Sequence, residues 1–360
     1  MTNAFSLLSP RLISLLIGAA TSLGAQPLFT FTEIPTLGGN YSEARAINNS
    51  GLVVGSSSYP SASTPTTFSL SGGLIDISST TSSTFSPNSV NASGQMAGTG
   101  NASGYEGAFT YSLAGGFVNL GTLGGNSSAA KGLNDSGQIV GSSTNASGDT
   151  RAFSYTSGGG MVDIGTLSGH TKATAYAVNN SGMIVGSSSI SVVTARAFSY
   201  TTAGGMIDLG SAFTPVALND SGQMAGSSTG SHAVFYSTGT GLVDLGTLGG
   251  ESSYGYGINS AGEVVGTSRD ENDDYHAFYY TGGTMYDLND LVTLTNGWVL
   301  YQATGINDLG QIVGIADDGF GNGRAFLLTP IPEPSTYALF FGLGALGLAG
   351  CLSRRCRWRR

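Results

Sequence analysis

One short pattern of polar and apolar residues recurs along most of the chain, and each copy predicts a β-hairpin. An apolar residue precedes Asn, two further residues and Gly, and a second Gly closes the apolar run that follows, as in Leu133-Asn-Asp-Ser-Gly-Gln-Ile-Val-Gly141. Asn and Ser bond locally to the backbone in turns, and Gly accepts a positive φ. Seven copies occur at spacings of roughly 40–48 residues, on Asn48, Asn91, Asn134, Asn179, Asn219, Asn259 and Asn307.

A second phrase follows each hairpin and adds two strands to every unit. It reads Arg or His, Ala, Phe, any residue, Tyr and Thr, and leads through Gly-Gly into an alternating run such as residues 161–167. We expect its anchors to be Phe68, Phe109, Phe153, Phe198, Phe235, Phe278 and Phe326. Each unit then holds four short strands, as a β-propeller blade does.

The two ends of the repeat array predict that the ring closes. The seventh unit stops after residues 324–329 without a fourth strand, whereas an additional strand-like run at residues 31–39 precedes the first unit. That run is similar to residues 161–169 and would complete the last blade, which removes two open sheet edges. The predicted fold is an all-β, seven-bladed propeller of four-stranded blades over residues 26–330. An open β-solenoid is the alternative.

Composition agrees with an all-β body and excludes several functions. Charged residues make up 10% of the chain and hydrophobic ones 40%, and 57 residues are Gly. This composition is too apolar for a disordered chain and too rich in Gly for a helical protein. Five of the 13 basic residues lie in the last seven positions; without them and Arg11, seven basic residues face 22 acidic ones. Such an acidic body repels phosphate backbones, so we expect no nucleic-acid partner. Both cysteines, Cys351 and Cys356, lie in the tail, so the body has no disulfide or Cys metal site.

The N-terminus has the pattern of a secretory signal peptide at residues 1–25. Arg11 supplies the positive charge, residues 12–20 form the apolar region, and Ala25 is the expected last residue before cleavage. The mature chain would begin near Gln26. A buried N-terminal helix is the alternative.

The C-terminus, residues 331–360, predicts a short membrane segment. Pro332, Glu333 and Pro334 precede an uncharged apolar run at residues 337–352, and the cluster of arginines follows it. We expect the run to form a transmembrane helix in the inner membrane with the arginines on the cytoplasmic side, which places the body outside that membrane. The signal peptide predicts the same topology.

This tail resembles the PEP-CTERM sorting signal, whose motif, hydrophobic helix and basic end all occur here in order. The resemblance implies processing by an exosortase-type enzyme, in Gram-negative bacteria that make exopolysaccharide. It also implies transient anchoring in the inner membrane and then a place in the cell envelope or outside the cell. A permanent single-pass anchor is the alternative.

The second phrase, literally His276-Ala277-Phe278 in the sixth unit, resembles the HAF repeat of predicted extracellular bacterial proteins. This resemblance implies architecture and export and no defined activity.

Candidate chemistry in the body is sparse. A recurrent acidic series is expected to stabilise turns or line one face: Asp76, Asp163, Asp208, Asp244 and Asp287, with Asn119 in the same place. Two acidic loops break the repeat, at residues 270–274 and 317–318, and could supply oxygen ligands for Ca²⁺; solvated loops are the alternative. The histidines His170, His232 and His276 show no shared spacing. We therefore predict no catalytic, cofactor or metal site.

These features predict an exported protein of the envelope or extracellular matrix that presents a rigid binding surface. The expected ligand is exopolysaccharide, as in a biofilm, or another surface component; the 16 Tyr and the abundant Asn suit sugars. One alternative is a secreted polysaccharide hydrolase or lyase; another is a structural matrix component without a ligand.

Overall fold

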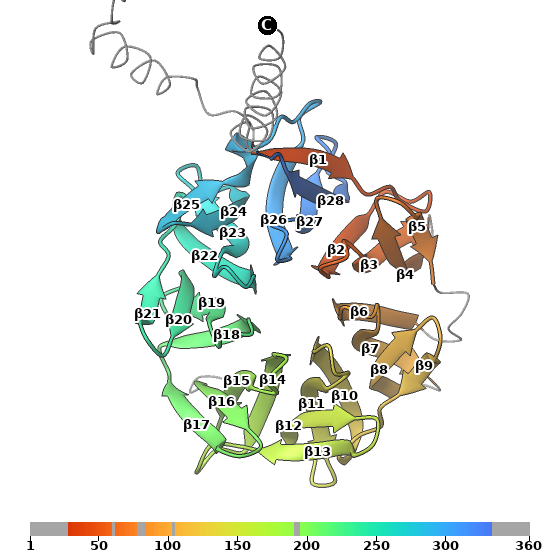
Figure 1. Cartoon of the computed structure of the whole chain (residues 1–360), viewed down its shortest axis with the longest axis vertical. Coiled ribbons are helices and arrows are strands. Elements are labelled where there is room, and N and C mark those ends of the chain that lie inside the picture. The colour runs from red at the N-terminus through yellow and green to blue at the C-terminus, as the bar shows by residue number, and fades with distance from the viewer. Residues whose placement is uncertain (1–27, 60–61, 78–83, 103–104, 191–194, 333–360) are drawn as a thin grey trace, which may run out of the picture.

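Short alternating runs of polar and apolar residues form antiparallel strands that assemble into seven four-stranded sheets around one axis (Figure 1). The computed structural model describes residues 28–59, 62–77, 84–102, 105–190 and 195–332. Blades 1 to 6 each use four consecutive strands, with the first strand innermost. The described residues also include the 3-10 helix η3 (Leu288–Asp290).

The strands of the first four blades follow the chain in order. Blade 1 contains β2 (Ser42–Ile47), β3 (Val53–Tyr59), β4 (Ala62–Ser69) and β5 (Gly73–Asp76). Blade 2 contains β6 (Thr84–Val90), β7 (Met96–Ala102), β8 (Tyr105–Ser112) and β9 (Gly116–Asn119). Blade 3 contains β10 (Gly124–Leu133), β11 (Ile139–Asn145), β12 (Thr150–Thr156) and β13 (Gly160–Gly165). Blade 4 contains β14 (Lys172–Val178), β15 (Ile184–Ser189), β16 (Arg196–Thr201) and β17 (Gly205–Gly210).

The remaining blades complete the ring. Blade 5 contains β18 (Phe213–Leu218), β19 (Met224–Ser228), β20 (Ala233–Ser237) and β21 (Gly241–Asp244). Blade 6 contains β22 (Gly249–Ile258), β23 (Val264–Asp270), β24 (Tyr275–Thr281) and β25 (Thr284–Asp287). Blade 7 contains β26 (Val299–Ile306), β27 (Ile312–Asp317), β28 (Gly323–Pro330) and β1 (Phe29–Glu33).

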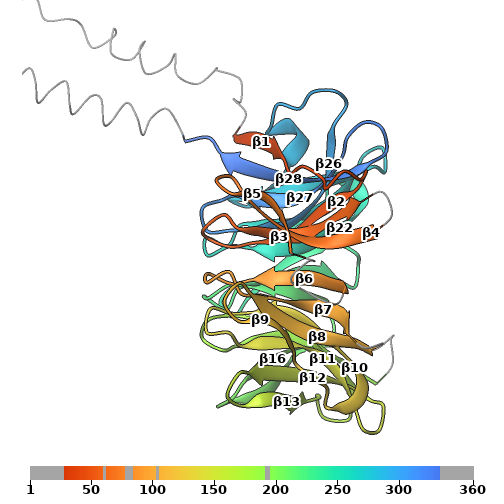
Figure 2. The same cartoon turned by 90° about the vertical axis from the view of Figure 1, so that its right-hand side faces the viewer.

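Blade 7 closes the ring with strands from both ends of the chain. β1 pairs antiparallel with β28, from Phe29 opposite Pro330 to Glu33 opposite Phe326, and both views show the two strands side by side (Figure 2). The predicted seven-bladed propeller closed by its N-terminal strand is therefore confirmed. The predicted signal peptide at residues 1–25 and the apolar run at residues 337–352 lie outside the described residues. Within the described part of the chain, no helix has the length and apolar character needed to cross a membrane.

Neighbouring blades pack through apolar clusters that draw side chains from both sheets. In one of them, Val140 of β11 packs with Ile184 and Phe198 of blade 4. Phe198 is fully buried, as are the phrase anchors Phe109, Phe153, Phe278 and Phe326. Burial of this aromatic surface stabilises the junctions that these blades form.

Two predicted anchors are wrong. In blade 5, Val234 pairs with Gly226 in the way that Phe198 pairs with Gly186, and Val234 is buried whereas Phe235 is only partly so. In blade 1, the residue opposite the corresponding Gly55 is Thr66, and Phe68 lies two residues further along. The anchor position is defined by its pairing with the glycine of the second strand, and residues other than Phe can occupy it.

Candidate functional site

The seven repeat asparagines join neighbouring blades in a closed circle. Each lies in the turn between first and second strands; the Oδ1 of Asn179, for example, accepts the N–H of Met183 at 2.9 Å. Its Nδ2 donates to the carbonyl oxygen of Asn219 in the next blade at 3.1 Å. The same amide bond links every junction, and Asn307 completes the circle by donating to Asn48 at 3.0 Å. Buried polar groups need such partners, so the asparagines serve assembly.

The residues that follow the asparagines form a polar rim on the same face, around a cavity of about 200 Å³. The N–H of Asn180 donates to the Oδ1 of Asp220 in the next blade at 2.8 Å. Burial raises the pKa of Asp308, but bonds from Ser260 and Asn49 outweigh it and hold that pKa below its ordinary value. These rim carboxylates are therefore already bonded across blade junctions.

Every first strand contains a β-bulge three residues before its asparagine. In blade 3 the pairing skips Lys131, because Ala130 pairs with Gly141 and Gly132 pairs with Val140. The same shift occurs in the other six blades, at Arg45, Asn88, Tyr176, Val216, Tyr256 and Thr304. Bulges re-aim a side chain and are frequent beside functional sites.

The glycine that closes the repeat phrase is what permits this bulge. A Cβ at Gly141 would collide with the carbonyl oxygen of Ala129, and the corresponding glycines of the other blades face the corresponding carbonyl. Only a residue without a side chain tolerates such a close backbone approach. The recurrence of this glycine is visible in the sequence, but its cause is not.

All seven bulge residues, together with Gln302, line one cavity of about 370 Å³ at the centre of the ring. We call these eight residues the channel site. Whereas the asparagine circle is uniform, the channel site is chemically mixed. In blade order its bulge residues are Arg45, Asn88, Lys131, Tyr176, Val216, Tyr256 and Thr304.

Blades 1 to 3 give the channel site a cationic side. Arg45 pairs with the Glu43 carboxylate, with 2.6 Å between Nη2 and Oε1, and donates through Nη1 to the Oδ1 of Asn88 at 2.9 Å. Lys131 lies over the ring of Tyr176, with its Nζ 5.6 Å from the centroid. Among the described residues, Lys131 forms no ion pair with a carboxylate. Its ammonium group is therefore available to a ligand.

Two tyrosines line the channel site, Tyr176 of blade 4 and Tyr256 of blade 6. Tyr41, just before β2, is not among its lining residues. Burial raises the pKa of Tyr256, and the neighbouring Tyr254 and Tyr275 raise it further. Burial, followed by the adjacent Glu43, also raises the pKa of Tyr41 to about 12. These phenols stay protonated at neutral pH and present both a ring face and a hydroxyl donor.

The recurrent aspartates hold the fourth strand of their blades, in agreement with the prediction. Asp163 accepts the N–H of Gly165 at 2.8 Å and the Nε of Arg151 at 2.9 Å. The same pairing of a basic residue with an Asp recurs as Arg196–Asp208, His232–Asp244 and His276–Asp287. His232 and His276 thus share a repeat position, contrary to the prediction; the sequence concealed it because Val234 replaces Phe in blade 5.

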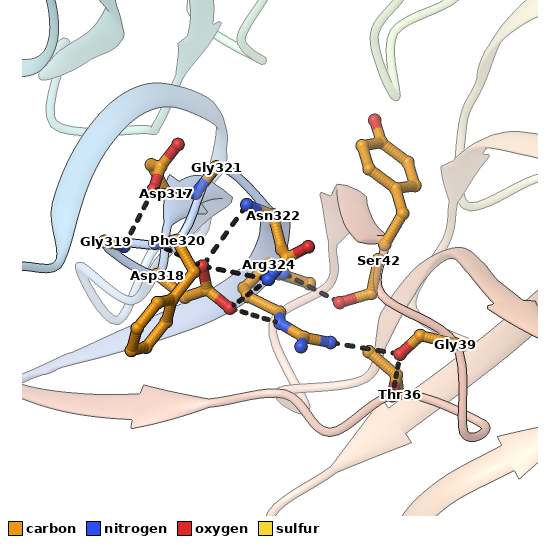
Figure 3. Close-up of polar contacts among 12 residues, drawn as sticks. Thr36, Gly39, Ser42, Asp317, Asp318, Gly319, Phe320, Gly321, Asn322 and Arg324 are labelled. Carbon is orange, nitrogen blue, oxygen red and sulfur yellow. Dashed lines mark hydrogen bonds and ion pairs between the residues drawn. The ribbon is translucent and has the colours of Figure 1, made fainter.

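The acidic loop at residues 317–318 lies at the seam between blades 7 and 1 (Figure 3). Asp317 accepts the N–H of Gly319 at 2.7 Å, and Asp318 accepts the N–H of Phe320 at 3.0 Å. Arg324 donates to Asp318 at 3.2 Å and to the carbonyl oxygen of Gly39 at 3.3 Å. These bonds tie the last blade to the segment that precedes the first one.

The second acidic loop is also closed by its own backbone. Asp270 accepts the N–H groups of Asn272 and Asp274, both at 2.9 Å, and Asp273 pairs with Arg269. Within the described ranges, no group of three or more His, Cys, Asp or Glu is placed to hold a metal ion. Calcium binding by either loop gains no support from this geometry.

Comparison with solved structures identifies the same fold at about 10% identity. A virginiamycin B lyase from Staphylococcus aureus aligns with a TM-score of 0.50, 10% identity, and coverage of 84% of this chain and 100% of that one. An acylaminoacyl peptidase from Pyrococcus horikoshii aligns with a TM-score of 0.54 and 10% identity over 83% of this chain and 54% of that one. A prolyl endopeptidase aligns with a TM-score of 0.51 and 10% identity over 86% and 51%. The chain spans about half the length of these two peptidases, and all three likenesses concern the fold alone.

Searches by sequence identify only the tail. No curated protein matches the chain, and the likeness of the second phrase to HAF repeats stays a prediction. Pro332 is the last described residue, whereas Glu333 and Pro334 lie outside the described part. Residues 330–357 match the family model described as the PEP-CTERM protein-sorting motif. The chain therefore carries a PEP-CTERM sorting motif, which implies export to the cell envelope or the extracellular space.

Proposed function

We propose that this protein is an exported saccharide-binding propeller whose channel site holds one or more sugar units. Exosortase-type processing at the tail would release the body from the inner membrane into the envelope or matrix. There exopolysaccharide is the expected ligand. The observation that carries the proposal is the set of seven bulges, which turn dissimilar side chains into one central cavity.

The chemistry of the channel site suits a sugar. A pyranose ring combines apolar C–H faces with hydroxyl groups that both donate and accept hydrogen bonds. Tyr176 and Tyr256 offer ring surfaces, while Asn88, Gln302 and Thr304 offer amide and hydroxyl partners. The cavity volume of about 370 Å³ lies in the range of small-ligand sites.

The charges of the channel site favour a saccharide ligand over a nucleic acid. Glu43 neutralises Arg45, so Lys131 is left as a single available cation in a strongly acidic body. One cation can orient a hydroxyl or a carboxylate substituent of a sugar, but it cannot offset the repulsion of a nucleic-acid backbone.

Calorimetric titration of the full chain with neutral and uronate-containing oligosaccharides tests the proposal. The detergent that keeps the chain in solution must have no sugar head group. Tyr176→Ala removes an aromatic face and should weaken binding about tenfold, since such a contact contributes about 1.4 kcal/mol. The matched control is Tyr286→Ala, because Tyr286 lies on the outer strand β25 and is 42% exposed. Both variants are compared with the parent by thermal melting.

The outcomes separate the candidate functions. Saturable binding that Tyr176→Ala weakens and Tyr286→Ala leaves unchanged supports the channel site. Equal effects of the two substitutions would place the ligand elsewhere, and an absence of saturable binding favours the structural matrix component. Shorter products in the titrated mixture would favour the polysaccharide hydrolase or lyase.

A further inference from the structure

Two further cavities lead outward from the channel site between blades 2 and 3. The first, of about 570 Å³, shares Arg45, Asn88 and Lys131 with the channel site and extends to Glu106. The second, of about 790 Å³, begins at Glu106 and Gly107. Because consecutive cavities share lining residues, we treat the two outer ones as a single feature, the radial groove, which continues the channel site toward the outer strands.

The radial groove opens where blade 2 departs from the repeat. In blades 3 to 6 an Arg or His on the third strand pairs with an Asp on the fourth, as Arg151 does with Asp163. Blade 2 has Gly107 and Asn119 at these two positions, since Gly107 lies opposite Gly100 as Arg151 lies opposite Ser143. Both residues line the radial groove. The space that an Arg or His side chain fills in blades 3 to 6 is open here.

The fold itself does not require either departure. Gly107 has an ordinary negative φ, and a Cβ there would meet its nearest atom, in the ring of Phe109, at 3.4 Å, which is normal contact. Asn119 still accepts the N–H of Gly121 at 2.8 Å, as the aspartates do in their turns. A side chain would fit at position 107, so the glycine there opens the surface without serving the backbone.

The lining of the radial groove fits a glycan better than a peptide. Its outer part combines the polar side chains of Asn119, Thr122 and Asn126 with flat glycine backbone at residues 121, 124 and 125. Among the described residues that line the two outer cavities, none has a large apolar or aromatic side chain. Protein ligands generally need such anchoring pockets, whereas sugar hydroxyls pair well with amides, hydroxyls and backbone groups.

We propose that the ligand is a linear glycan that passes from the channel site along the radial groove to the outer edge of blades 2 and 3. This inference rests on the proposed saccharide binding and adds its direction and length. Affinity should then rise with chain length until the glycan fills the groove, and it should stay constant beyond that length.

The test restores the repeat in blade 2 with the double substitution Gly107→Arg and Asn119→Asp. The titration uses a homologous series of neutral oligosaccharides from mono- to octasaccharide. The charges added by the two substitutions then meet no opposite charge on the ligand. We expect the affinity for long members to fall about tenfold, to the level of the short ones, with the short ones unchanged. The matched control, Arg151→Gly with Asp163→Asn, removes the same pair from blade 3 and should keep the length dependence.

A second variant tests the radial groove independently, in case the double substitution in blade 2 misfolds. Ala146→Trp places a large ring in the groove next to Gly124, whereas Glu271→Trp places it at the equivalent turn of blade 6, next to Gly249. Only Ala146→Trp should remove the gain in affinity with length. Both are exposed turn positions, so neither substitution disturbs the core.

The results distinguish this inference from the proposed function. If short sugars bind but affinity does not rise with length, or if the length dependence survives both groove variants, the radial groove is not part of the site and the channel site stands. If neither this series nor the uronate-containing oligosaccharides bind, the proposed function fails. If an unstructured peptide binds in a way that Ala146→Trp abolishes, the glycan assignment is wrong.

Discussion

Breaking one junction of the asparagine circle should cost about 3 kcal/mol of unfolding free energy. Asn179→Ala removes the amide bond to Asn219 at 3.1 Å and the bonds that Oδ1 accepts from Ser181 at 2.8 Å and Met183 at 2.9 Å. The side chain is only 4% exposed, so water cannot easily replace these partners. Three bonds at a net contribution of about 1 kcal/mol each give the estimate.

The matched control is Asn145→Ala. Asn145 caps the turn between β11 and β12 by accepting the N–H groups of Ser147 at 3.0 Å and Asp149 at 2.9 Å. The turn that it closes is exposed, and both of these bonds lie within blade 3, so we expect a loss of about 1 kcal/mol or less. The comparison thus isolates the buried, inter-blade part of the asparagine contribution.

Equilibrium unfolding in urea, followed by tyrosine and tryptophan fluorescence, measures both losses. A loss for Asn179→Ala near 3 kcal/mol, well above that for Asn145→Ala, supports the circle as a stabilising device. Equal losses in the two variants would refute the reasoning, because the amide bonds between blades would then contribute nothing measurable.

Two further predictions concern the seam and the tail. Burial raises the pKa of Asp318, but bonds from Asn322, the N–H of Phe320 and Arg324 outweigh it and lower that pKa to about 2. Because the pKa is lower in the folded than in the unfolded protein, the ionised carboxylate stabilises the fold at pH values above the unfolded-state pKa. This stabilisation is lost as the pH falls through the folded-state pKa. The urea midpoint of the parent should therefore exceed that of Asp318→Asn at pH 5, and the difference should shrink as pH falls from about 4 to 2; a constant difference contradicts this assignment. For the tail, intact-mass measurement on separated membrane and extracellular fractions of the producing cells should find a species that begins near Gln26 and ends near Pro332 outside the membrane. A membrane species that still carries Arg354 and Arg360 would identify a permanent anchor instead.

The propeller could be predicted because its assembly residues repeat. The Asn turn and the closing glycine recur in every blade, and the complementary ends predicted the pairing of β1 with β28. The predicted anchors were wrong in the two blades where a residue type, Phe, was used to locate a structural position. Phe235 and Phe68 were expected as anchors, yet Val234 and Thr66 lie opposite the glycines of their blades. A buried position accepts several residue types, so identity alone does not locate it.

The channel site escaped prediction for a related reason. The position three residues before each asparagine holds a different residue in nearly every blade, so a search for recurrence passes over it. The bulge that aims these side chains inward depends on the contact between Gly141 and the carbonyl of Ala129, and on its counterparts in the other blades. A three-dimensional contact of this kind leaves only the glycine visible in the sequence.

Departures from the repeat are where a seven-bladed ring can acquire specificity. Seven equal blades would present seven equal surfaces, and a ligand without sevenfold symmetry would have no preferred orientation among them. In this protein, Lys131 and Arg45 lie on one side of the channel site, and Val216 and Tyr256 belong to blades across the ring. Gly107 opens the radial groove beside Lys131 rather than elsewhere. The uniform asparagines hold the ring together, and the unequal positions give it a direction.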